Sequence, residues 1–413
     1  MKLPDGTLIS AHVDEQGRLV LPDEFTQGNG LRPGSAVSLR ITREGLVLRP
    51  PLSQLQKVYI EPTSRCNLSC RTCIRNAWNE PLGHMDAATF ERVLAGLAGL
   101  QPRPTIFFGG FGEPLMHPDI AHMVERAAGI AAHVELITNG ILLKQQVSAD
   151  LINAGLGTLW ISLDGASPES YADVRLSNSL DGVLENIAAY RDQYRRLHGD
   201  EPDIGAVFVA MRRNIDELPP LVRQSTRLGI SRYMVTNVLP YTPEMCGEVL
   251  YQHAVDDWGG APSPWNPSVD MPQIDLNPIT RETLLKLRAM QPGSQAERRN
   301  TCPFVEQRSM SIAWDGSVSP CLALLHAHTS YLFDIQRSVQ PQRMGNVNSQ
   351  PLMEIWRSEE YTRFRQKVED FDFSPCTICA GCEMAEGNQE DCFGNSFPTC
   401  GGCLWARGVV RCP

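Results

Sequence analysis

Six strand-like segments alternate with helix-like segments between residues 57 and 240, and this alternation limits the possible folds more than any other feature. The strand candidates are KVYIEP, TIFFGG, HVELITNG, TLWISLDG, IGAVFVAM and RYMVTNVLP, with helix candidates such as DGVLENIAAYRDQYRRL between them. Repeated strand–helix units predict an α/β fold with helices outside a parallel sheet, either open and doubly wound or a partial (β/α)6 TIM-type barrel. In both folds, ligands bind at the carboxyl ends of the strands.

Three cysteines follow the first strand candidate, in the loop EPTSRCNLSCRTCIRN. Cys66, Cys70 and Cys73 form a CxxxCxxC motif. Soft thiolates at this spacing suit an iron–sulfur cubane whose fourth iron stays open to another ligand. A zinc site would need a fourth cysteine or histidine nearby, and His84 is too far along the chain to be assumed. The motif therefore favours an iron–sulfur cluster at the end of the first strand.

The CxxxCxxC motif and the segments after the later strands together resemble the radical S-adenosylmethionine (radical SAM) enzymes. The resemblance covers residues 57 to about 240. FFGGFGEP resembles their Gly-rich segment, although the common form lacks the intervening Phe111 and Gly112. The resemblance implies that Cys66, Cys70 and Cys73 hold a [4Fe–4S] cluster that binds SAM. It also implies that adenine packs on VTNVLPYTPEM and that other strand-end residues contact SAM, namely Gly109, Gly110, Glu113, Asn139, Ser162, Asp164 and Arg175.

Some of these residues also have purely structural interpretations. The two glycines could form only a tight turn, Ser162 and Asp164 could cap the next helix, and Arg175 could lie on the surface. Their recurrence after successive strands favours a shared site, because a barrel gathers its strand ends at one opening. By the resemblance, one electron cleaves SAM and a 5′-deoxyadenosyl radical removes a hydrogen atom from the substrate.

Nine of the 13 cysteines lie beyond residue 301. The spacing C-x13-G-x4-C at their start resembles the SPASM extension of radical SAM enzymes, which implies two auxiliary [4Fe–4S] clusters. Their ligands would come from Cys302, Cys321, Cys376, Cys379, Cys382, Cys392, Cys400, Cys403 and Cys412. Nine thiols exceed the eight ligand places by one, and CTICAGC departs from the usual gaps. A zinc ribbon made from the CxxC pairs at 376/379 and 400/403 stays an alternative.

Residues 1–52 read as short strands, in ISAHVDEQGRLVLP and SAVSLRITREGLVLRPP. The pattern resembles the AbrB-like swapped-hairpin domains, which implies dimerisation and often DNA binding. Six basic and six acidic residues leave this segment neutral, a poor electrostatic footprint for DNA. We therefore expect a β domain for homodimerisation or protein docking, with DNA an unlikely partner.

The remaining boundaries follow from composition. Residues 53–240 form the expected barrel, 241–300 a Pro-rich insertion and linker with one helix, TRETLLKLRAM, and 301–413 the SPASM-like domain, where His326 and His328 are interpreted as a polar loop. Neither a secretory signal nor an apolar run long enough for a membrane span is present, so we expect a cytoplasmic location. Cytosolic thiols are kept reduced, which disfavours disulfides. The net charge of −10 argues against a general nucleic-acid binder.

As a whole-chain pattern, the sequence resembles the radical SAM maturases of tungsten-containing aldehyde ferredoxin oxidoreductases. This resemblance implies modification of the tungsten enzyme or of its pterin cofactor, with ferredoxin or flavodoxin as electron donor. Two alternatives belong to other classes: a maturase that modifies a peptide substrate, and a redox-sensing regulator that binds DNA through the N-terminal domain.

Overall fold

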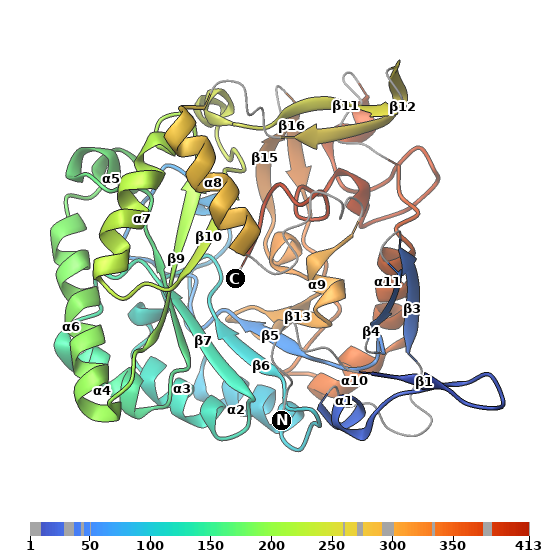
Figure 1. Ribbon diagram of the computed structural model, residues 1–413, viewed down its shortest axis with the longest axis horizontal. Coiled ribbons are helices and arrows are strands. Elements are labelled where there is room, and N and C mark those ends of the chain that lie inside the picture. Colours follow the sequence, from blue (N-terminus) through green and yellow to red (C-terminus); the bar gives the residue numbers. More distant parts are fainter. Residues whose placement is uncertain are drawn as a thin grey trace.

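The central element of the protein is a nine-stranded sheet. The computed structural model describes residues 10–28, 37–42, 45–49, 51–258, 261–270, 276–290, 301–332, 335–374 and 382–412. In the sheet the strands follow the order β10-β9-β8-β7-β6-β5-β13-β14-β17 (Figure 1). The strands of the alternating region pair in parallel and are β5 (Lys57–Ile60), β6 (Thr105–Phe108), β7 (His133–Thr138), β8 (Thr158–Ser162), β9 (Asp203–Ala210) and β10 (Arg232–Asn237).

The strand order decides between the two expected folds. A doubly wound sheet reverses its order at a switch point, whereas β5 to β10 follow one another in sequence. Right-handed crossovers between such strands place the connecting helices on one face. Figure 1 shows them outside the sheet: α2 (Ala87–Leu97), α3 (Ile120–Ala128), α4 (Gln145–Asn153), α6 (Leu180–His198) and α7 (Leu218–Arg227). The partial (β/α)6 barrel is confirmed, and its sheet ends at β10 and β17 without closing in the described chain.

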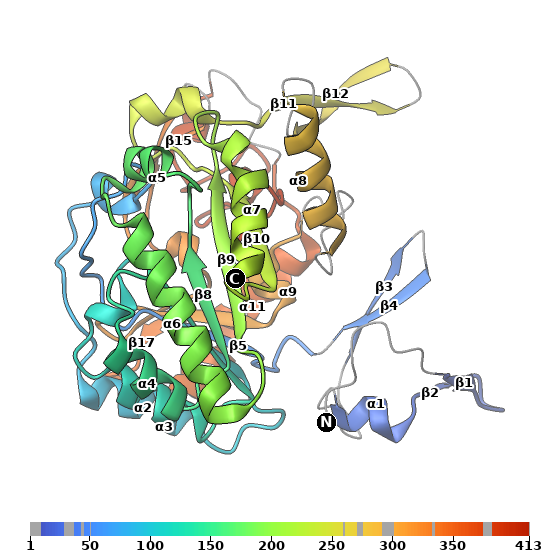
Figure 2. The same ribbon diagram turned by 60° about the vertical axis from the view of Figure 1, so that its left-hand side comes forward.

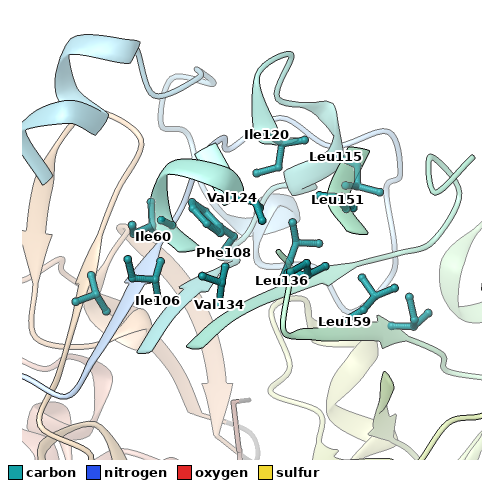
Figure 3. Packing of buried hydrophobic residues seen from close by; sticks show 14 of the residues in the cluster. Ile60, Ile106, Phe108, Leu115, Ile120, Val124, Val134, Leu136, Leu151 and Leu159 are labelled. Atoms are coloured by element: carbon teal, nitrogen blue, oxygen red, sulfur yellow. The ribbon is translucent and has the colours of Figure 1, made fainter. Parts of the chain in front are cut away.

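Both faces of the sheet are buried, which explains why its strands read as nearly continuous apolar runs. On the helix side, Ile60, Phe108 and Leu136 pack against Val124 of α3 and Leu151 of α4 (Figure 3). On the interior side, alternate residues of the same strands join a second buried cluster that includes Tyr59, Phe107, Trp160, Leu404 and Trp405. The C-terminal segment therefore fills the concave face of the partial barrel.

The C-terminal segment also extends the sheet itself. β13 (Ser309–Ile312) pairs in parallel with β5, and β14 (Ser317–Ser319) and β17 (Gly345–Asn346) continue the sheet in antiparallel fashion. One sheet therefore contains strands from both sides of the expected boundary at residue 301. The segment further contains α9 (Pro303–Glu306), β15 (His328–Leu332), β16 (Ile335–Val339), α10 (Leu352–Arg357) and α11 (Glu359–Asp370).

The N-terminal region contains two hairpins, β1 (His12–Val13) with β2 (Leu19–Val20) and β3 (Ser38–Thr42) with β4 (Gly45–Arg49). Figure 2 shows them apart from the barrel. A short helix, α1 (Asp23–Gly28), was not expected in this all-β segment. Its first turn carries Asp23 and Glu24, which favour a helix N-terminus. The resemblance to AbrB-like domains stays a prediction.

The insertion between residues 241 and 300 contains the expected helix, α8 (Pro278–Met290), and a 3-10 turn at Pro243–Glu248. It also contains an unexpected antiparallel pair, β11 (Gln252–Trp258) and β12 (Ala261–Asp270). Its prolines concealed the pair, since proline argues against strands. Within the described ranges, no helix combines the length and apolar character that a bilayer crossing requires.

Candidate active site

The CxxxCxxC loop is fastened at both ends beside the carboxyl end of β5. Thr63 Oγ1 donates to the carbonyl of Gly83 at 2.8 Å, and Met85 N donates to the carbonyl of Pro62 at 2.8 Å. Between these ties, Cys73 N donates to the carbonyl of Cys70 at 3.1 Å, which forms the turn between the second and third cysteines. The sequence between β5 and α2 is thus held as a closed loop at the barrel opening.

The three thiols lie close enough to influence one another. Burial raises the pKa of Cys66 and raises that of Cys73 to about 11, and each pKa is raised further by the neighbouring Cys70 thiol. Leu68 N donates to Cys66 Sγ at 3.4 Å. Thiols with raised pKa values hold their protons until a metal displaces them. This trio fits the expected cluster, with three thiolates supplied by one loop.

The Gly-rich segment FFGGFGEP lies directly against this loop. A Cβ on Gly112 would stand 2.0 Å from the Thr63 carbonyl oxygen, so a side chain has no room there. Gly110 has a φ of +130°, and a Cβ there would meet Glu61 at 2.7 Å. Glu113 N donates to the carbonyl of Arg65 at 2.8 Å. The insertion of Phe111 and Gly112 relative to the common motif is therefore accommodated by close backbone contact with the cysteine loop.

Glu113 is a buried anchor within the site. Its carboxylate accepts hydrogen bonds from Thr138 Oγ1 at 2.6 Å, Asn139 N at 2.8 Å and Leu115 N at 3.1 Å. Burial raises the pKa of Glu113, although these hydrogen bonds oppose the rise. Asn139 in turn donates from Nδ2 to Asn67 Oδ1 at 2.8 Å, next to Cys66. Glu113 and Asn139 therefore join the ends of β6 and β7 to the cysteine loop.

Asp164 and Arg175 form a buried ion pair on the other side of the loop. Asp164 Oδ2 lies 2.7 Å from Arg175 Nη2, and Asp164 Oδ1 accepts a hydrogen bond from Val209 N at 2.8 Å. Arg175 Nη1 donates to Cys70 Sγ at 3.8 Å. Burial raises the pKa of Asp164 although Arg175 lowers it. Arg175 thus lies in the site and not on the surface, while Ser162 is half-buried at the end of β8.

Four cysteines of the C-terminal segment line one cavity of about 80 Å³, namely Cys302, Cys321, Cys400 and Cys403. Burial raises the pKa of all four thiols, to about 12 for Cys302. Four cysteines around one cavity equal the number of cysteine ligands that one cubane takes. The cysteines of the C-x13-G-x4-C spacing and of the CxxC at 400/403 therefore line the same cavity.

The other described cysteines of this segment, Cys382, Cys392 and Cys412, do not line this cavity. Cys412 Sγ accepts a hydrogen bond from Trp405 Nε1 at 3.2 Å, and burial raises the pKa of this thiol to about 11. Cys382 is half-buried and Cys392 exposed. Cys376 and Cys379 fall outside the described residues.

A single-ion site such as zinc needs its ligands tightly gathered around one atom. Among the described side chains, no group of three or more Cys, His, Asp or Glu residues is gathered so closely. A cubane spreads its ligands over four irons, so four thiols around a cavity suit it better. The described half of the expected zinc ribbon, Cys400 and Cys403, shares its cavity with Cys302 and Cys321.

Sequence reasoning missed three polar residues of this region. Asn67 contacts Asn139, and its position between the first two cysteines of the CxxxCxxC motif was a usable signal. Glu61 and His326 are both buried and hydrogen-bonded to each other at 2.9 Å. His326 lies in a loop, as interpreted, but its side chain is buried, whereas His328 begins β15 and is buried as well. The signal available for Glu61 was an acidic residue directly after an apolar strand.

Comparison with known proteins identifies the family and the fold of this chain. Residues 60–219 match the radical SAM superfamily, and residues 302–383 match the iron–sulfur cluster-binding SPASM domain. The solved structure of anSMEcpe with bound AdoMet has the same fold, with a TM-score of 0.53 and 15% identity, covering 86% of this chain and 96% of that one. The fold and site thus define a radical SAM enzyme with a [4Fe–4S] cluster that binds SAM and an auxiliary iron–sulfur domain.

Two curated relatives refine this class. The tungsten-containing aldehyde ferredoxin oxidoreductase cofactor-modifying protein of Pyrococcus furiosus is 32% identical over 367 residues, covering 87% of this chain and 97% of that protein. The PqqA peptide cyclase of Rhodopseudomonas palustris is 28% identical over 337 residues, 80% of each chain. The chain belongs to the radical SAM family that includes the cofactor-modifying protein.

Proposed function

We propose that this enzyme is a maturase that modifies a tungsten-containing oxidoreductase or the pterin cofactor of that enzyme. The observation that carries the proposal is the similarity to the Pyrococcus furiosus protein, which extends over nearly all of both chains. It spans the barrel, the insertion and the auxiliary-cluster segment together. A fold-level likeness alone would support only the superfamily.

In this proposal the strand-end residues have two kinds of role. Cys66, Cys70 and Cys73 hold the cluster that, when present, supplies the electron for cleavage of SAM and so the 5′-deoxyadenosyl radical. Gly109, Gly110 and Ser162 line the approach to the methionine part of SAM. Glu113, Asp164 and Arg175 position the loops through their buried contacts, and Asn139 does both. The C-terminal segment fills the concave face and so excludes water, and a reactive radical requires such exclusion.

The auxiliary segment and the partners complete the proposal. Cys302, Cys321, Cys400 and Cys403 hold one auxiliary cluster, and the second takes its ligands from Cys376, Cys379, Cys382, Cys392 and Cys412. Ferredoxin or flavodoxin supplies electrons, and the N-terminal hairpins mediate homodimerisation or docking to the substrate protein. Anaerobic reconstitution should give about twelve irons per chain if all three cubanes form.

The test compares the tungsten oxidoreductase produced with and without this enzyme. Mass spectrometry of the intact oxidoreductase, its peptides and its extracted pterin should reveal a mass difference that depends on SAM. A control with Cys66, Cys70 and Cys73 changed to alanine should leave about eight irons and give the mass of the untreated protein. Identical masses with active and inactive enzyme would contradict the proposal.

A second candidate is modification of a short peptide. It rests on the similarity to the PqqA peptide cyclase over 80% of each chain. Under this alternative, the enzyme would alter the mass of a peptide encoded beside its gene and leave the tungsten oxidoreductase unchanged. DNA binding has weaker support, because the N-terminal segment has balanced charge; salt-sensitive binding to a duplex would revive that alternative.

A further inference from the structure

A buried histidine from the auxiliary segment joins both ends of the cysteine loop. His326 follows Cys321 by five residues and is 3% exposed. Its Nε2 lies 2.9 Å from Glu61 Oε2, and its Nδ1 is hydrogen-bonded to Glu80 Oε2. Ala327 N also donates to Glu80 Oε1, at 2.8 Å. Glu61 directly follows β5 and Glu80 follows Cys73 by seven residues, so the two carboxylates bracket the loop.

The contacts define the charge of this group. Both ring nitrogens of His326 face a carboxylate oxygen, and a carboxylate can only accept hydrogen bonds unless it is protonated, so the geometry suits an imidazolium. Burial lowers the pKa of His326, but the hydrogen bonds and charges of Glu61 and Glu80 outweigh it and raise the value overall. Trp78 and Phe111 pack edge-on to the ring, with centroids 4.4 and 5.9 Å away. Both aromatic rings limit the access of water to His326.

Glu61 connects this group to the Gly-rich segment. Its Oε1 accepts a hydrogen bond from Phe111 N at 3.0 Å, while its side chain occupies the space that a Cβ on Gly110 would need. A shift of Glu61 would therefore move the backbone of residues 110 and 111. The same carboxylate that bonds to His326 thus fixes the segment assigned to the methionine part of SAM.

We propose that His326 is a positioning residue for SAM cleavage: it fixes Glu61 and Glu80, and through them holds the cysteine loop and the Gly-rich segment in the geometry that binds SAM. Through His326, the geometry of the SAM site depends on the position of the auxiliary segment, although His326 and Glu80 are about 250 residues apart in sequence. The inference rests on SAM binding at the Gly-rich segment. It does not depend on which substrate the enzyme modifies.

The test uses the full, reconstituted protein and SAM itself. H326Q should retain the wild-type iron content, because no cluster ligand is changed. Its half-saturating SAM concentration, read from the SAM-induced change in the electron paramagnetic resonance spectrum of the reduced cluster, should rise about 10- to 100-fold, as for other residues that orient ligands. In SAM cleavage, KM should change more than kcat.

Two further variants make the result decisive. H133Q is the matched control, since His133 is half-buried and bonded to Thr158 Oγ1 at 2.7 Å, at the start of β7 and away from the site. It should bind SAM like the wild type. E80Q changes a more exposed partner, with 21% side-chain exposure, and should weaken SAM binding even if H326Q fails to fold. Unchanged SAM affinity in H326Q or in E80Q, or an equal loss in H133Q, would overturn the proposal.

Discussion

The buried pair of Asp164 and Arg175 allows a quantitative test of the site's electrostatics. The side chain of Asp164 is 1% exposed and that of Arg175 11%, and their charged atoms are 2.7 Å apart. Asp164→Asn keeps the size and the acceptor for Val209 N but removes the negative charge. Breaking a buried pair in this way costs about 3–5 kcal/mol, because the remaining charge is left uncompensated.

This cost can be converted into a melting temperature. With an unfolding entropy of about 2.1 cal/mol/K per residue, a cooperative unit of 413 residues would melt about 3–6 °C lower. We expect this loss in protein without clusters. Because Arg175 Nη1 also reaches Cys70 Sγ, an anionic cluster on the loop would partly replace the lost carboxylate. The reconstituted variant should therefore lose less than the cluster-free variant.

Differential scanning fluorimetry under anaerobic conditions, with and without clusters, measures both effects. Glu91→Gln is the control, since it breaks the ion pair of Glu91 with Arg126 on the surface. The side chain of Glu91 is 46% exposed and that of Arg126 is 45% exposed. Such pairs contribute at most about 1 kcal/mol. A loss in Asp164→Asn no larger than in this control would refute the buried-charge argument. An equal loss of melting temperature with and without clusters would refute the expectation that an anionic cluster on the loop compensates the charge of Arg175.

Three further outcomes are expected. Gly112→Ala should slow SAM cleavage about 10²-fold, because the added Cβ would displace the Thr63 backbone. Gly182→Ala should not, because its added Cβ would meet nothing within 4 Å beyond the neighbouring backbone of its own helix. Cys302→Ser should remove about four irons per chain, and an unchanged iron content would contradict the proposal that Cys302 holds an auxiliary cluster. Since the pKa of His326 is raised, its stabilising contacts are complete below the unfolded value near 6.5 and disappear as pH rises through the folded value. The melting-temperature difference between wild type and H326Q should therefore shrink toward alkaline pH.

The barrel could be predicted from sequence because its strands are buried on both faces and separated by amphipathic helices. Each strand from β5 to β10 lies where an apolar run predicted it, whereas β13, which pairs in parallel with β5, was not predicted. A helix after Asp164 was considered, but the bounds of α5 (Pro168–Arg175), which carries Arg175, were not predicted, because it is short and has little apolar periodicity. Its start signal, Ser167 accepting a hydrogen bond from Ser170 N, is local and was readable.

The site was only partly predictable, because spacing reveals groups within one loop and not contacts between distant segments. Cys66, Cys70 and Cys73 stand within eight residues, so their grouping could be predicted directly. The grouping of Cys302 with Cys400 depends on the C-terminal segment folding back into the concave face of the barrel. The role of Glu113 could not be predicted from its motif either. The motif predicts a contact to SAM, whereas the structure shows that both carboxylate oxygens accept hydrogen bonds from protein groups.

The buried charges of the barrel show why the auxiliary segment and the SAM site act as one unit. Glu61, Glu113, Asp164, Arg175 and His326 all have side chains at most 11% exposed and all cluster where the parallel strands end. A buried charge is unfavourable unless it is paired or hydrogen-bonded, and each of these five groups has its partner on a different element of the chain. The site therefore forms only when those elements are in place together. Because His326 is supplied by the auxiliary segment, an enzyme lacking that segment would leave Glu61 Oε2 without its histidine partner, and the hydrogen bond from Phe111 N to Oε1 would be left to hold this buried carboxylate.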